Sequence, residues 1–218
     1  MMLRAVPLGH KGSPLPAGRP TEGEALRARA FADAQRGHEF LAGRIALRVL
    51  VGEALGVGPG RILPLYRCPA CGDGEHGSPG FALAASDDGD AGDALSTRLL
   101  LAASMSRAAG WALLGLERSR ECSAPARIGV DLAHASDFGT IPDSAFSSRE
   151  CLRLTASRDA QAEAARLWAR KEALLKAMGT GLRTDPASVE TLGDPRVVDL
   201  DARALGLPDG FSAAAARL

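Results

Sequence analysis

The chain has 218 residues, of which 26 are Lys or Arg and 26 are Asp or Glu, so its formal net charge is zero. This balance argues against a nucleic-acid-binding protein, and 46% hydrophobic residues suffice for a core in one domain or in two lobes of roughly 100 residues each. Four Cys in a chain of this length do not form a disulfide framework. Residues 1–20 hold no apolar signal segment, and the most apolar run, residues 99–116, is interrupted by Arg107 and Gly110. We therefore expect a cytoplasmic protein with no membrane or nucleic-acid partner.

The first 58 residues are predicted to form an irregular segment or short edge strand, followed by helices. Residues 1–22 are rich in Pro and Gly, which disfavours a long regular element. Thr21-Glu22-Gly23-Glu24 has the pattern of a helix N-cap, and apolar residues recur at helical spacing from Phe40 to Leu50. Arg residues are frequent in these helices. Solvated faces account for most of them, and one or two could bind a phosphate.

Residues 58–80 are predicted to form a loop-rich connection. This connection contains Cys68-Pro69-Ala70-Cys71 and, a few residues later, His76. A lone CxxC motif is a weak zinc signal, because structural zinc takes four ligands and only three candidates lie near. The following residues, 81–93, begin apolar and become acidic, which is typical of a short strand that runs into a loop.

The middle of the chain is predicted to form a β-hairpin and then a single strand. Residues 96–116 hold two apolar runs, with the turn expected at residues 107–110. Ser104, Ser106 and Arg107 would place two hydroxyls and a guanidinium where a phosphate could bind, with ordinary turn chemistry as the alternative. Residues 127–132 form a short apolar strand that includes Asp131, which would need a partner or a cation there. Two short helices are expected within residues 138–154.

The principal helix is predicted from Ala160 to Leu182, with Gly179 as its C-cap. Only three residues of the chain are Lys, and two of them, Lys171 and Lys176, lie in this helix. On a helical projection Lys171 falls near the middle of the apolar face, while Glu172 and Lys176 lie along its edge. A snorkelling Lys beside an ordinary Glu–Lys pair is the alternative to a functional role. Strands and turns are expected in residues 189–218.

Asp131 and Glu172 suggest a cation site. If Asp131 ends a core strand and Glu172 faces it from a packed helix, both carboxylates can bind one hard cation, and Mg²⁺ typically takes one or two carboxylates plus phosphate oxygens. Lys176, one turn further along, could bind the same phosphates. These groups are typical of phosphoryl-group transfer.

At this point the sequence resembles a known family. Gly129-Val130-Asp131, followed by Trp168-Ala169-Arg170-Lys171-Glu172-Ala173-Leu174-Leu175-Lys176, resembles the paired signature of the 4′-phosphopantetheinyl transferases. The chain's size and upstream features resemble the surfactin-type branch, whose single chain holds two similar lobes. The resemblance covers most of the chain, and the paired signature is its specific part.

The resemblance implies an α+β fold of two similar lobes related by pseudo-twofold symmetry, each a small antiparallel sheet packed on a long helix. Residues 1–125 would form an N-terminal lobe that binds coenzyme A. Residues 126–218 would form a C-terminal lobe that carries the Mg²⁺ and catalytic residues. Because one chain supplies both lobes, the resemblance implies a monomer.

The resemblance also implies a reaction. A Ser hydroxyl of an apo acyl or peptidyl carrier protein attacks the β-phosphate of coenzyme A, phosphopantetheine moves to the Ser, and adenosine 3′,5′-bisphosphate leaves. Asp131 and Glu172 would bind Mg²⁺, with Glu172 as the general base. Lys176 would bind the phosphates, and Lys171 would hold the helix and its acidic neighbours in place. The carrier could belong to fatty acid, polyketide or nonribosomal peptide synthesis, the last two being secondary metabolism.

For coenzyme A, the resemblance points to Arg27 at the 3′-phosphate and to Ser106 and Arg107 at the phosphates. The sequence departs from the family at three places: Ala133 stands where a second acid is frequent, Ser78 replaces the Lys of a Gly-Lys-Pro loop, and Arg107 replaces a His. A non-catalytic protein of the same fold that binds coenzyme A or a carrier is one alternative. A small zinc or nucleic-acid module built on the Cys residues and the N-terminal Arg residues is another.

Overall fold

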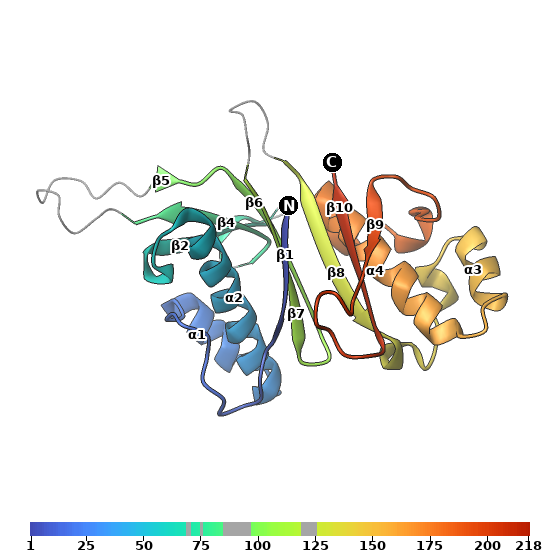
Figure 1. Cartoon of the computed structure of the whole chain (residues 1–218), viewed down its shortest axis with the longest axis horizontal. Coiled ribbons are helices and arrows are strands. Elements are labelled where there is room, and N and C mark those ends of the chain that lie inside the picture. The colour runs from blue at the N-terminus through green and yellow to red at the C-terminus, as the bar shows by residue number, and fades with distance from the viewer. Residues whose placement is uncertain (69–70, 75, 85–96, 119–125) are drawn as a thin grey trace, which may run out of the picture.

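The chain folds into helices and antiparallel sheets, so the predicted α+β class is confirmed. The computed structural model describes residues 1–68, 71–74, 76–84, 97–118 and 126–218. Figure 1 shows α1 and α2 on one side of the central strands and α3 and α4 on the other. Within these ranges, no helix is both long enough and apolar enough to cross a lipid bilayer.

The chain begins with an edge strand, followed by two helices: β1 spans Met2–Pro7, α1 spans Glu22–Arg29 and α2 spans Ala34–Leu55. The predicted N-cap is confirmed, because the Thr21 hydroxyl accepts a hydrogen bond from the Glu24 backbone and the Glu24 carboxylate accepts one from the Thr21 backbone. Gly56, at φ +70°, ends α2. The helices expected in this region are therefore present.

The prediction of a loop-rich connection at residues 58–80 is wrong, because three strands lie there. They are β2 (Ile62–Cys68), β3 (Gly72–Gly74) and β4 (Ser78–Leu83). β2 pairs with both β3 and β4, and the short strand β5 (Thr97–Arg98) extends the sheet at β4. Pro64 lies within β2 and Pro79 within β4. Because Pro is expected only at the edges and bulges of a sheet, both prolines weaken the strand pattern in the sequence. Residues 85–96, most of the next predicted loop, lie outside the described residues.

The predicted hairpin is confirmed as β6 (Leu101–Ala108) and β7 (Trp111–Arg118). Ala109 and Gly110, at φ +44° and +77°, form the two-residue turn that suits the twist of paired strands. Ser104–Arg107 therefore lies inside β6 rather than at the turn. β7 pairs with β1 on its other edge, which completes the sheet β1-β7-β6.

The second half begins with a strand and ends with another, and two helices lie between them. Its elements are β8 (Ile128–His134), α3 (Ser148–Thr155), α4 (Ala160–Met178), β9 (Val197–Leu200) and β10 (Phe211–Arg217). The principal helix is confirmed, with Gly179 as its left-handed C-cap at φ +75°. Of the two short helices expected at residues 138–154, α3 is one, and 3₁₀ turns at residues 135–138 and 143–145 stand in place of the other.

α4 packs directly against β8 because small residues let the backbones approach. A Cβ on Gly129 would lie 1.9 Å from the Ala173 carbonyl oxygen of α4, so only glycine fits there. Ala214 and Ala216 of β10 are also buried against this helix. This close approach brings the edge of α4 within reach of the side chains of β8.

The two halves share an order of elements. In each three-stranded sheet the first strand of the half pairs with the last, and the last pairs with the one before it, giving β1-β7-β6 and β8-β10-β9. In each half a short helix begins with a capping box whose Glu is fully buried and paired with a cation of the long helix that follows. These pairs are Glu24–Arg48 and Glu150–Lys171, each at 2.6 Å.

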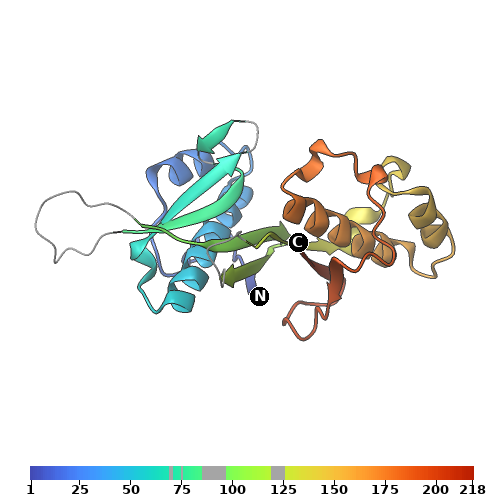
Figure 2. The ribbon, with the colours of Figure 1, turned by 90° about the horizontal axis from the view of Figure 1, so that it is seen from above.

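The halves meet along β6, β7 and β8. The Ser104 hydroxyl of β6 accepts a hydrogen bond from the Val130 backbone of β8 at 3.0 Å. Leu113 of β7 lies in one buried cluster with Val130 and Leu132 of β8. Figure 2 shows the green and yellow-green strands of this junction in the middle of the molecule, with the helices of the two halves on opposite sides of them. Residues of both halves can therefore contribute to one site at this junction.

Candidate active site

Asp131 is the centre of the site, and its carboxylate is held from both halves of the chain. It lies on β8 with 4% of its surface exposed. The Ser106 hydroxyl of β6 donates a hydrogen bond to Asp131 Oδ1 at 2.6 Å, and Lys176 Nζ of α4 lies 2.6 Å from the same oxygen. Burial raises the pKa of Asp131, and the contacts with Lys176 and Ser106 act against this rise. The predicted need of this strand acid for a partner is met by a cation and a hydroxyl.

Lys176 is fixed by two contacts at the C-terminal end of α4. Besides Asp131, its ammonium donates to the Val130 carbonyl oxygen at 3.2 Å. About a quarter of its side chain, 27%, remains exposed, and Lys176 lines the cavities described below. Lys176 therefore compensates the charge of Asp131 and can still reach a ligand.

Glu172 lies one turn before Lys176 and faces the same space. Burial raises the pKa of its carboxyl, Lys176 opposes the rise and the charge of Asp131 adds to it. Two carboxylates from β8 and α4 therefore interact, as the sequence predicted, and both are partly desolvated. A divalent cation suits this donor set, because it favours both carboxylates in the charged form and takes oxygen ligands.

A cavity of about 420 Å³ joins these groups. Its lining includes most of the residues predicted to be functional, together with aromatic and small side chains: Ser106, Arg107, Asp131, Ala133, Phe138, Trp168, Glu172 and Lys176. Ala133, at the position where the family often has a second acid, leaves one side of this cavity without a carboxylate.

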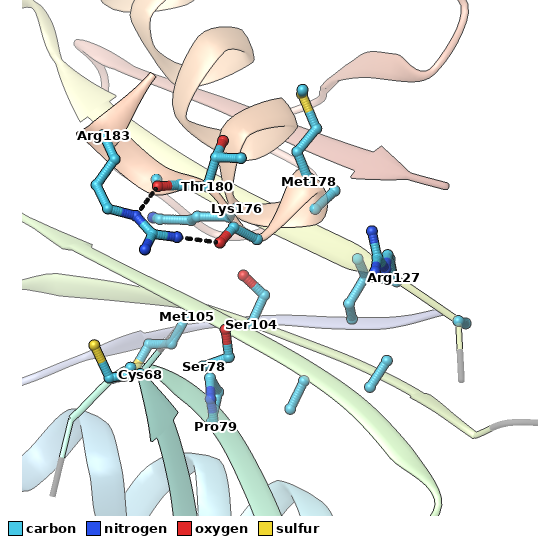
Figure 3. Close-up of a pocket in the computed structure, with 18 residues that line it drawn as sticks. Cys68, Ser78, Pro79, Ser104, Met105, Arg127, Lys176, Met178, Thr180 and Arg183 are labelled. Atoms are coloured by element: carbon cyan, nitrogen blue, oxygen red, sulfur yellow. Dashed lines mark hydrogen bonds between the residues drawn. The ribbon is translucent and has the colours of Figure 1, made fainter. Parts of the chain in front are cut away.

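A second cavity, of about 630 Å³, lies beside the first and is lined by both halves of the chain. Figure 3 shows Ser78 and Ser104 on one side and Lys176, Thr180 and Arg183 on the other. Arg183 donates to the Thr180 and Gly179 carbonyl oxygens at 3.1 and 3.2 Å, which fixes its guanidinium at the cavity wall. Because Lys176 lines both cavities, a long ligand could extend from one to the other.

Three arginines surround the ring of Phe40 near these cavities. The guanidinium carbons of Arg27, Arg44 and Arg107 lie 5.8, 4.6 and 5.5 Å from its centroid, and Arg44 also stacks on Tyr66 at 3.6 Å. Burial lowers the pKa of Arg107, and the nearby charges of Arg44 and Arg27 lower it further. Like charges gathered in this way form a site suited to a phosphate.

The structure divides the predicted residues among three neighbouring places. Asp131, Glu172, Lys176, Ser106 and Arg107 share the smaller cavity. Ser78 lines the larger cavity with Lys176, and Arg27 lies in the arginine cluster. The sequence reasoning did not single out Arg44 or Arg183. Arg44 follows Phe40 by four residues on α2, a helical spacing that places the two side chains together and could have pointed to it.

Lys171 has a partner that the sequence did not name. It is fully buried, as its place on the apolar face predicted, but its ammonium pairs with Glu150 of α3 and donates to the carbonyl oxygens of Pro186, at 2.7 Å, and Val189. The sequence predicted that Lys171 holds the helix and its acidic neighbours, and the acid that it contacts is Glu150 on the neighbouring helix. Lys171 ties α4 to α3 and to the segment after α4, because a buried ammonium must have its charge and its donors satisfied.

The fold and the site together define an α+β protein with paired carboxylates and a lysine at a strand–helix junction. Residues 127–200 match the model of the 4′-phosphopantetheinyl transferase superfamily. The match runs from the start of β8 to the end of β9, contains Asp131, Glu172 and Lys176, and supports phosphopantetheinyl transfer at the level of the superfamily. Comparison with curated proteins gave no match.

Proposed function

We propose that the chain transfers 4′-phosphopantetheine from coenzyme A to a Ser of an apo acyl or peptidyl carrier protein. In this reaction the Ser hydroxyl attacks the β-phosphate and adenosine 3′,5′-bisphosphate leaves. The observation that carries the proposal is the convergence of Asp131, Glu172 and Lys176 on one cavity within the segment that matches the superfamily. Asp131 of β8 meets two residues of α4, Glu172 and Lys176, where a pyrophosphate and a divalent cation could both be held.

Asp131 and Glu172 would hold Mg²⁺, which supplies positive charge for the pyrophosphate when it is bound. Glu172 is the candidate general base, because burial raises the pKa of its carboxyl and a less acidic carboxylate accepts a proton more readily. Lys176 would bind a phosphate oxygen with the part of its ammonium that remains exposed. Ser106 would keep Asp131 in position through its hydrogen bond.

The coenzyme would occupy the larger cavity and extend to the arginine cluster. Arg27 and Arg107 would bind the 3′-phosphate and a neighbouring phosphate, as the family resemblance suggests, and we add Arg44 to this set. Ser78 would contact the coenzyme from the other wall of the larger cavity. Without the family's Lys at this position, the three arginines supply the positive charge.

We also infer that the chain belongs to the surfactin-type branch, with lobes at residues 1–125 and 126–218 related by a pseudo-twofold axis, and acts as a monomer. Two features support this inference: the sheets share one strand order, and each half has a buried Glu–cation pair between its short and long helices. The Ser106–Asp131 hydrogen bond joins the two halves within one chain, so a second chain is not required to complete the site.

The direct test is transfer to a carrier. The purified protein is incubated with coenzyme A, Mg²⁺ and an apo carrier of the fatty acid, polyketide or nonribosomal peptide type, and intact mass spectrometry follows the carrier. We expect the mass of one phosphopantetheine to be added to at least one carrier, and no addition with EDTA in place of Mg²⁺. Calorimetry that detects coenzyme A binding while every carrier mass stays unchanged would instead select the non-catalytic binding protein.

A further inference from the structure

A second group of metal-binding side chains lies outside the carboxylate site, at one end of the sheet formed by β2, β3 and β4. Cys68 ends β2, Cys71 lies in the turn before β3, and His76 lies between β3 and β4. The ligand atoms of these three residues lie within 4.8 Å of one another. The sequence named these three candidates but gave only a weak signal, and the fold brings their ligand atoms together.

Strand pairing and glycine conformation fix the three residues in place. Cys68 is paired with Gly72 across β2 and β3, and Arg67 with Ser78 across β2 and β4. Gly72, at φ +82°, turns the chain directly after Cys71. A Cβ on Gly77 would lie 2.2 Å from the Arg67 carbonyl oxygen, so only glycine lets the chain cross so close to the end of β2. This crossing brings His76 over the two cysteines.

The ligand set selects the metal. Two sulfurs and an imidazole are soft and borderline donors, which favour Zn²⁺ over Mg²⁺ or Ca²⁺. The two sulfurs lie within 4.8 Å of each other, close enough for one ion to bridge them after a small adjustment. Neither Cys68 nor Cys71 forms a disulfide in this structure, so both sulfurs are available as thiolate ligands.

We propose that Cys68, Cys71 and His76 bind one Zn²⁺ ion, with a solvent molecule in the fourth position of the tetrahedron. Three protein ligands with an open fourth position are a known zinc arrangement, and Cys71 is exposed to the water that would complete it. The ion would join β2, the turn before β3 and the turn before β4. Pairing over a three-residue strand such as β3 gives little stability by itself, so a metal crosslink would stabilise this end of the sheet.

The site lies next to the larger cavity. Cys68, Gly77, Ser78 and Pro79 all line that cavity, and Figure 3 shows Cys68 beside Ser78 and Pro79 on the same wall. A bound Zn²⁺ would therefore fix the wall that presents Ser78. If the proposed transferase function holds, loss of zinc should raise the KM for coenzyme A more than it lowers kcat.

The test measures metal content and is independent of transfer. The full-length protein is purified without chelators, saturated with Zn²⁺ and separated from unbound metal. Its zinc content is then measured by elemental mass spectrometry. We expect about one zinc per chain, and less than about a tenth of that in Cys71→Ser and His76→Gln. Cys151→Ser and His10→Gln are matched controls at positions outside the cluster, and both should keep their zinc.

Cobalt substitution gives a second readout. Co²⁺ bound to these ligands should show the intense visible absorption of a tetrahedral thiolate site, and Zn²⁺ should displace it. A protein that holds no zinc after saturation, or whose Cys71→Ser variant keeps it, overturns the proposal. So does a Cys68–Cys71 disulfide that persists in freshly reduced, zinc-treated protein. None of these outcomes depends on whether a carrier is modified.

Discussion

At the scale of single residues, the site depends on how neighbouring groups balance the negative charge of carboxylates that are partly shielded from water. Asp131 has Lys176 and Ser106 on one oxygen, and its burial is therefore tolerated. Glu172 shares the cavity, and both burial and the charge of Asp131 raise its pKa. A carboxyl in that state binds a proton more readily than an exposed one, so pH should affect the stability of the metal-free protein.

Glu172→Gln should remove part of this pH dependence. A folded-state pKa raised above the usual 4.5 means that the folded protein keeps a proton that the unfolded chain has lost, so the free energy of unfolding falls as pH rises above 4.5. Urea denaturation of the metal-free protein between pH 4 and 8 should show this fall. Gln cannot ionise, so the free energy of unfolding should fall less with pH in Glu172→Gln. The control Glu163→Gln, on the same helix, should retain the part of the fall that Glu172 causes.

The same substitution should affect chemistry. Loss of a general base typically lowers the rate by about 10²–10⁴-fold, and we expect kcat of Glu172→Gln to fall by that amount. If Glu172→Gln transfers phosphopantetheine at the rate of the unmodified protein, the role given to this carboxylate is wrong.

Lys176→Met tests the compensation of Asp131 directly. Removing the ammonium leaves a buried carboxylate with one partner fewer, and we expect the free energy of unfolding to fall by about 1–3 kcal/mol at pH 8. The loss should be smaller at pH 5, where the pKa of Asp131, raised further in the variant, lets it bind a proton. Adding Asp131→Asn should recover most of the stability, and Lys11→Met, at an exposed position, should cost little. A double variant as unstable as Lys176→Met at both pH values would mean that the lysine stabilises the fold by another route.

At the scale of elements, the structure shows what the sequence can reveal. The helices and the β6–β7 hairpin follow from periodicity and from caps such as Thr21 and Gly179, which are local signals. β2 and the first half of β4 were missed because Pro64 and Pro79 weaken the strand pattern, whereas the short strand predicted from Phe81 matches the end of β4. The burial of Lys171 was predictable from one helix, but its partner Glu150 was not, because that pairing depends on how two helices pack.

The same distinction applies to the site. Asp131, Glu172 and Lys176 could be predicted because an acid in an apolar strand and a lysine in an arginine-rich chain are each unusual. For Arg44 the helical spacing could have predicted only the contact with Phe40, since its stacking on Tyr66 joins α2 to a strand that the sequence did not reveal. Local chemistry therefore predicted the residues of the carboxylate cavity better than those of the arginine cluster.

Gly129→Ala should separate α4 from β8. The added methyl carbon would lie 1.9 Å from the Ala173 carbonyl oxygen, and backbone on both sides must move to avoid it. We expect a loss of stability of about 1–3 kcal/mol or more in urea denaturation. Gly139→Ala is the matched control, because nothing lies within 4 Å of its Cβ position and it should leave the midpoint nearly unchanged. Equal midpoints for the two variants would show that the helix and strand can separate without cost.

At the scale of the whole molecule, the residues of the candidate site lie where the two halves meet. β6 supplies Ser104 and Ser106, which bond to the backbone of Val130 and to the side chain of Asp131 on β8. The larger cavity is lined from both sides of this junction. Packing between β7 and β8 should therefore control both stability and the geometry of the site.

Gly115→Ala tests that packing. The new Cβ would lie 2.6 Å from Cγ1 of Val130, and we expect a destabilisation of about 1–3 kcal/mol from overpacking. Shortening Val130 should relieve this overpacking. The double variant Gly115→Ala with Val130→Ala should therefore be more stable than the sum of the two single effects predicts. Calorimetric melting of the four proteins measures this coupling. Strict additivity would contradict the proposed contact between β7 and β8.

The hydrogen bond between Ser106 and Asp131 has a consequence for warming. An acid and the hydroxyl that orients it come from opposite halves, so a slight parting of those halves disconnects them while every helix is still intact. Heating should therefore abolish the proposed transfer activity at a temperature several degrees below the one at which circular dichroism detects unfolding. Cooling should restore the activity at once.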